Sequence, residues 1–124
     1  MEFVYKDELP IETLPGRGIR KAVGSESYFT STNMSVGYAM YNYEYGPMEP
    51  HQHDEETVII THSNMGWMSW GDSKTNLPNR VELVEGMVIH IPNGEWHVFN
   101  YDEGGSVEII FVYGTTANLR PEER

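Results

Sequence analysis

Short stretches rich in β-branched and aromatic residues recur along this chain, and this pattern most constrains the fold that the chain can adopt. Val58, Ile59 and Ile60 lie between threonines in 57–61, and tyrosines dominate 35–45. These residue types pack well on a pleated sheet, and none of the stretches shows a helical apolar period. Turn residues separate them at a spacing of about ten residues. The pattern predicts an all-β sandwich or barrel of about nine or ten short strands.

The expected strands can be bounded from these turn residues. Ser63-Asn64 predicts a hairpin turn, and 102–105 predicts a tight turn before the last strand. Residues 1–16 contain Pro10 and Pro15, so we expect an extended arm there, followed by a single barrel domain over 17–114 and a polar tail over 115–124. The strands are expected at 17–24, 27–34, 35–45, 57–61, 65–70, 81–84, 87–91, 95–101 and 107–113.

Three histidines are the candidate metal ligands. His51 and His53 are separated by one residue, so on an extended backbone their side chains point to the same face, with Cα atoms about 6.6 Å apart. His97 follows the turn sequence Pro92-Asn93-Gly94, which would aim the next strand inward. Three imidazoles with one carboxylate suit a divalent transition metal: Mn, Fe, Co, Ni or Zn.

The residues around these histidines resemble the two signature motifs of the cupin superfamily. The first motif matches Gly46 and the His51-Gln52-His53 pair, with shorter spacings on both sides of the pair. In the second motif, the spacing of Gly86, Pro92, Gly94 and His97 fits the family. The resemblance covers roughly residues 36 to 113. It implies a double-stranded β-helix, which is a small jelly-roll barrel with a metal in its mouth.

The identity of the carboxylate ligand is open between Glu55, Glu56 and neither. The family's longer spacing from His53 would fall on Thr57, a poor ligand. Glu56 precedes the apolar strand by the usual number of residues, so we favour the ligand set His51, His53, Glu56 and His97. The alternative is that both glutamates are solvated acids at the start of a strand.

Other residues are weaker candidates. Glu95 shares strand parity with His97, so it is a candidate proton carrier, and Tyr41 is a second one. Aromatic residues at strand spacing more often serve as packing. The aromatic residues that could line a pocket or fill the core are Tyr41, Tyr43, Trp67 and Trp70. His62 is expected at the surface beside a turn and His90 on the outer sheet face, so neither is counted as a ligand.

Composition excludes several classes of partner. The chain has 19 acidic and 8 basic residues, a formal net charge of −11, so we expect neither nucleic acid nor an anionic membrane as a partner. It has no cysteine, which excludes disulfides, thiolate ligands and a cysteine nucleophile. With no signal-peptide pattern and no apolar run of about 20 residues, we expect a cytoplasmic protein.

The expected site leaves several functions open. An ion held by four protein ligands keeps open positions for substrate, so the leading hypothesis is an enzyme of the isomerase or lyase type. It would use Lewis-acid chemistry on a small oxygen-rich substrate such as a sugar or hydroxy acid. The alternatives are an Fe-dependent dioxygenase and a non-catalytic protein that binds a small ligand. Because the family often pairs barrels, the resemblance also implies a homodimer.

Overall fold

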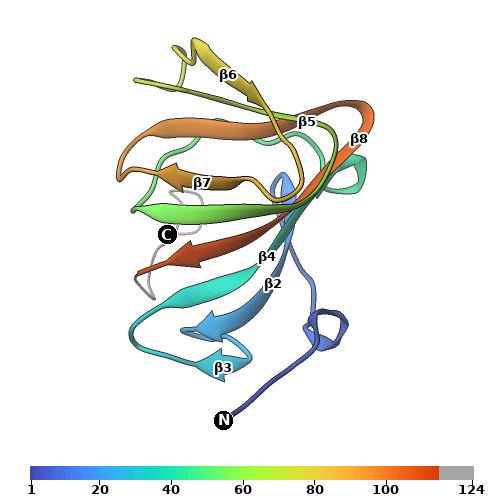
Figure 1. The fold of residues 1–124 in the computed structure, drawn as a ribbon, viewed down its shortest axis with the longest axis vertical. Coiled ribbons are helices and arrows are strands. Elements are labelled where there is room, and N and C mark those ends of the chain that lie inside the picture. The colour runs from blue at the N-terminus through green and yellow to red at the C-terminus, as the bar shows by residue number, and fades with distance from the viewer. Residues whose placement is uncertain (115–124) are drawn as a thin grey trace.

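The computed structural model describes residues 1–114, and within them the chain forms a single antiparallel arrangement of strands with one short parallel contact (Figure 1). The path of neighbouring strands is β1-β2-β4-β8-β5-β6; β3 pairs with β2, and β7 pairs with β5. This confirms the all-β prediction. The strands are β1 (Glu12–Leu14), β2 (Arg17–Gly24), β3 (Phe29–Thr30), β4 (Ser35–Asn42), β5 (Glu56–Gly71), β6 (Asn79–Glu82), β7 (Val88–Ile91) and β8 (Trp96–Tyr113).

Two predicted turns are wrong, because β5 and β8 are long continuous strands that pair with each other along most of their length. The register runs from Glu56 opposite Tyr113 to Gly71 opposite Trp96. The predicted hairpin turn at Ser63-Asn64 and the predicted tight turn at 102–105 lie inside these strands. Together β5 and β8 form one two-stranded ribbon, and the predicted strands 57–61 and 65–70, like 95–101 and 107–113, are its halves.

The turn residues instead produce a bend in the ribbon. The pairing shifts register between Asn64 and Gly66, Met65 takes a positive φ of 56°, and Gly104 takes a φ of 83°. A Cβ on Gly105 would lie 2.5 Å from the carbonyl oxygen of Asn64, so glycine allows the two backbones to approach here. Both strands turn back on the right-hand side of Figure 1, so the two halves of the ribbon lie in different layers.

The core fills the space between these layers. Alternate residues of the strands point inward, as the two-residue period requires. The fully buried apolar cluster is Ala39, Tyr41, Val58, Ile60, Met68, Leu83, Ile91, Phe99, Val107 and Ile109. Tyr41 stacks on Phe99 with ring centroids 5.2 Å apart, and this contact joins β4 to the first half of β8.

The remaining predicted strands differ from the structure mainly at their ends. The predicted strand 35–45 stops at Asn42, whose side chain accepts a hydrogen bond from the backbone N–H of Glu44 and so begins a 3₁₀ turn over Tyr43–Tyr45. The predicted strand 27–34 is reduced to Phe29–Thr30. The predicted strand 17–24 coincides with β2, and the predicted strands 81–84 and 87–91 differ from β6 and β7 by one or two residues at their ends.

The N-terminal residues lie against the edge of the sheet. Glu12–Leu14 pair with β2, Leu9 is buried, and a 3₁₀ turn covers Lys6–Glu8. The Arg20 guanidinium donates to the Leu9 carbonyl at 2.6 Å, and Lys6 forms an ion pair with Glu108 at 3.1 Å. The predicted tail over 115–124 lies outside the described residues.

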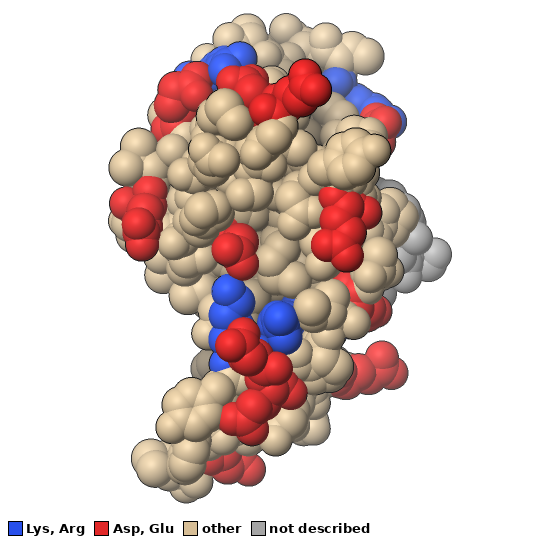
Figure 2. All heavy atoms as spheres, turned by 90° about the vertical axis from the view of Figure 1, so that its right-hand side faces the viewer, with Lys and Arg blue, Asp and Glu red and all other residues tan. Residues whose placement is uncertain are grey.

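Acidic side chains are spread over the face shown in Figure 2, and the few basic side chains on it lie beside them. In residues 1–114 the structure contains no helix with the length and apolar character needed to span a membrane.

Candidate metal centre

The candidate site lies where the two ends of the β5/β8 ribbon meet. Glu56 is the first residue of β5, and His97 is the second residue of β8, so the bend in the ribbon brings these opposite ends together. His51 reaches the same place through a β-bridge to His97, in which each residue donates its N–H to the other's carbonyl at 3.0 and 2.9 Å. The carbonyl of His53 accepts from the N–H of Gly94 at 3.0 Å, which fixes the adjoining turn.

The three histidine side chains form a compact buried cluster. Their ring centroids lie 4.4 Å apart for His51 and His97, 4.8 Å for His53 and His97, and 5.3 Å for His51 and His53. One ligand nitrogen from each ring lies within 4.8 Å of the others. Nitrogens bound to one ion at about 2.1 Å lie roughly 3–4 Å apart, so the cluster is close to the spacing that a metal requires.

The hydrogen bonds of these rings determine which nitrogen faces the cluster. The Nδ1 atoms lie 3.0 Å from the Glu49 carbonyl for His51, 2.8 Å from the Asp54 carbonyl for His53 and 2.8 Å from the Glu95 carbonyl for His97. A carbonyl oxygen only accepts, so each Nδ1 carries the proton. Each neutral ring therefore has its lone pair on Nε2, which is the ligand form of histidine. This donor set fits a divalent metal.

The two candidate glutamates lie on opposite sides of the strand. Glu56 is 4% exposed, and its Oε1 lies 3.5 Å from Nε2 of His53. The side chain of Glu55 lies outside, where its carboxylate binds the exposed ring of His90. Only Glu56 is therefore placed to join the histidines, and its role as the fourth ligand stays a prediction.

The two candidate proton carriers differ in their surroundings. Glu95 is half-buried in the turn directly before β8, and its backbone carbonyl orients His97. Tyr41 is 2% exposed, and its ring stacks on Phe99 inside the core. Of the two, only Glu95 has contact with solvent, which a group that exchanges protons with water needs.

His62, Tyr43 and Trp67 lie away from the cluster, whereas Trp70 lies beside His97. His62 is exposed within β5, not beside a turn, and its Nε2 lies 3.0 Å from the Ser106 hydroxyl. Tyr43 is exposed, so it lines no interior space. Trp67 carries the Arg80 guanidinium 4.0 Å above its ring on the outer surface, and Trp70 lies opposite His97 in the ribbon.

Tyr113 is a neighbour of the site that sequence reasoning missed. Its ring meets the ring of His53 edge-on with centroids 5.4 Å apart, and its backbone lies opposite Glu56. The alternation of Val107, Ile109, Phe111 and Tyr113 was available as a signal for one shared face. It gave no indication of which end of that face would meet the histidines.

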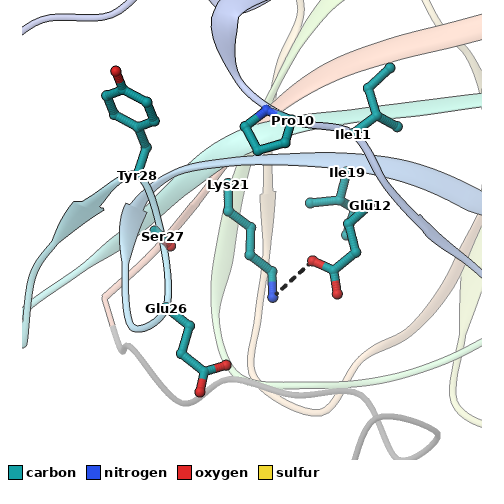
Figure 3. Close-up of a pocket in the computed structure, with 8 residues that line it drawn as sticks. All are labelled: Pro10, Ile11, Glu12, Ile19, Lys21, Glu26, Ser27 and Tyr28. Atoms are coloured by element: carbon teal, nitrogen blue, oxygen red, sulfur yellow. Dashed lines mark ion pairs between the residues drawn. The ribbon is translucent and has the colours of Figure 1, made fainter.

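A separate hollow of about 310 Å³ lies between β1, β2 and the turn before β3 (Figure 3). Lys21 and Glu12 point toward each other there and form an ion pair at 3.3 Å. None of the predicted metal ligands lines it, so it is distinct from the histidine cluster.

Comparison with solved structures shows the fold. The polyketide cyclase RemF from Streptomyces resistomycificus is 21% identical with a TM-score of 0.70, and the match covers 98% of this chain and 82% of that one. A W96F oxalate decarboxylase from B. subtilis is 18% identical with a TM-score of 0.66, over 90% of this chain and 29% of that one. Hydroxypropylphosphonic acid epoxidase from S. wedmorenis is 17% identical with a TM-score of 0.62, over 90% and 58%.

Neither protein-family models nor curated protein sequences gave a match. The folded-back ribbon, the paired motifs and these structural neighbours together define the class: the chain has the cupin fold and carries a group of three histidines that could hold a metal ion. The resemblance seen in the sequence is thereby confirmed at the level of fold.

Proposed function

We propose that this protein binds one divalent transition metal through His51, His53, Glu56 and His97 and is an enzyme acting on a small oxygen-bearing molecule. The observation that carries the proposal is the orientation of the three rings. Three separate backbone carbonyls hold three buried imidazoles in the same tautomer, with all three Nε2 atoms turned to one place. A histidine that only packs in a core has no need of two others with matching orientation.

The bound ion and the residues around it would have different roles in the proposed reaction. When bound, a divalent ion supplies Lewis-acid polarisation of a substrate oxygen. The buried rings and apolar walls exclude water from the site, which strengthens every electrostatic interaction within it. Glu95 is the group we assign to proton transfer in an isomerisation or elimination, because it lies two residues from His97 and is half-buried. Tyr41 is the second candidate.

Metal content separates the roles of these residues. The experiment measures bound metal and then turnover for His97→Ala, Glu95→Gln and the control Glu103→Gln, which changes an exposed glutamate of β8. We expect His97→Ala to lose the metal, and Glu95→Gln to keep it while losing about 10²–10⁴-fold in rate. Full metal retention by His97→Ala would contradict the site. Full activity of Glu95→Gln would remove Glu95 as the proton carrier.

A second candidate function is an Fe-dependent dioxygenase. It is favoured by the likeness to hydroxypropylphosphonic acid epoxidase, which has been solved with Fe(II), and by the mixed histidine and carboxylate donor set. Oxygen consumption by the iron-loaded protein in the presence of a substrate would distinguish it from the leading proposal. A protein that binds ligands without turnover or oxygen uptake would be the non-catalytic alternative.

We also propose that the protein is a cytoplasmic homodimer. The absence of cysteine from the sequence supports a reducing compartment. The exposed side chains of Phe3, Tyr5 and Ile11 in the N-terminal segment support burial against a second copy.

A further inference from the structure

Aromatic side chains lie beside the histidine cluster on more than one side. Tyr113 meets His53 edge-on at 5.4 Å, and Phe111 lies 5.6 Å from Tyr113. Phe99 approaches His97 with ring centroids 6.5 Å apart and is itself stacked on Tyr41. The side chains around the cluster therefore include flat aromatic rings from both halves of β8, and the ring of Tyr41 from β4 lies behind one of them.

Polar side chains are scarce in the interior of the described chain. The buried polar or charged residues within 1–114 are Arg17, Glu56 and the three histidines of the cluster. Arg17 lies at the start of β2, where its guanidinium donates to the Pro15 carbonyl at 3.0 Å. The partly buried hydrophobic residues that pack against the core add apolar surface around it: Ile19, Met48, Val81, Met87, Ile89, Tyr101 and Phe111.

This composition discriminates between classes of substrate. A hydroxyl that enters an apolar site without a hydrogen-bond partner costs roughly 1–3 kcal/mol by protein mutational data. A sugar would bring several hydroxyls, and the interior offers few side chains to receive them once the histidines and Glu56 hold a metal. An aromatic ring instead gains from burial and from edge or stacking contacts with other rings.

We infer that the site takes a flat aromatic molecule carrying two neighbouring oxygen atoms, with Tyr113 forming one wall for its ring. This inference rests on the proposed metal site, since the oxygen pair would point to the histidine cluster. Tyr113 is suited to this position because it is half-buried, lies opposite Glu56 and touches His53. It therefore lies beside the buried donors and is itself only partly buried.

Two hydroxamates test the inference, because benzohydroxamate and acetohydroxamate share the same oxygen pair and differ in phenyl against methyl. Titration calorimetry on the Co²⁺-loaded protein measures both affinities, and the Co²⁺ absorption spectrum reports whether each probe reaches the ion. We expect benzohydroxamate to bind at least about tenfold more tightly, as burial of a ring predicts. Xylose serves as the polyol probe and should bind more weakly than either.

Variants of Tyr113 test whether its side chain forms the wall that contacts the ring of the probe. Tyr113→Ala should bring the two hydroxamates to within about threefold of each other by weakening benzohydroxamate alone, since it removes a ring contact. Tyr113→Phe should retain the preference. The matched control is Tyr43→Ala, which removes an exposed tyrosine and should change neither affinity. The comparison of probes on the unaltered protein requires no variant to fold.

The outcomes separate this inference from the proposal beneath it. A protein that takes up no Co²⁺ overturns both. A loaded protein that binds the hydroxamates equally, or binds xylose more tightly, overturns only the aromatic preference. Unchanged selectivity in a folded Tyr113→Ala protein overturns the role of Tyr113.

Discussion

Metal ions should raise the thermal stability of this protein, and His97→Ala should abolish the rise. An ion that binds only the folded chain stabilises it by about 2.7 kcal/mol at a concentration one hundred times its Kd. An unfolding entropy of about 2.1 cal/mol/K per residue over 124 residues is about 0.26 kcal/mol/K. The expected rise in Tm is therefore about 10 °C for the unaltered protein.

His97 is the residue to remove, because its ring lies within 5 Å of both other rings and its backbone is bonded to His51. The alanine variant also leaves a cavity, so the quantity to compare is the rise on adding Ni²⁺ and not the absolute Tm. Unfolding can be followed by the fluorescence of the three tryptophans. The control His62→Ala removes an exposed histidine and should keep the full rise. An equal rise in His97→Ala would refute the site.

Four further predictions concern the core, the carboxylates and the assembly. Phe99→Ala should lower the free energy of unfolding by about 3–5 kcal/mol, measured by urea titration, because it empties a buried stacking position. Burial raises the pKa of the Tyr101 hydroxyl above its ordinary value of 10.0. The unfolded chain therefore releases that proton first, and stability should fall as pH rises through about 10. In Tyr101→Phe this part of the fall should be missing. Glu56→Gln should weaken metal binding and Glu55→Gln should not, as judged by metal content after dialysis; the reverse would show that the other carboxylate is the ligand. Light scattering should give a dimer, deletion of 1–14 should weaken it, and a mass near 14.2 kDa would reject it.

The strands could be predicted because their residues have a strong local preference for extended backbone. Val58, Ile59 and Ile60 favour a strand in almost any surroundings. The bend could not be predicted in the same way. Asn64 and Gly104 are residues that make hairpin turns, and only the long-range pairing of β5 with β8 turns them into a bend in continuous strands. Local propensity contains no information about a partner forty residues away.

The candidate site shows the same division. The pair His51 and His53 with His97 was visible from residue type and spacing, and the structure brings the three together. Glu56 was favoured over Glu55 because of its distance from the apolar strand, since the shortened loop after His53 puts the family's spacing on Thr57. Tyr113 was missed because its closeness to His53 arises only when the end of β8 returns beside the start of β5.

The angle of the bend in the ribbon also determines where His97 lies relative to the other candidate ligands. His97 lies eight residues from Gly105, or roughly 26 Å at 3.3 Å per residue, so a change of about 5° there would move it by about 2.3 Å. Ligand distances at a metal tolerate only about 0.2 Å. The backbone conformation at Met65 and Gly105 therefore sets the distances between the candidate ligands, although neither residue contacts the site. Substitutions at the bend would therefore change which metal the site prefers, even with all of the candidate ligands unchanged.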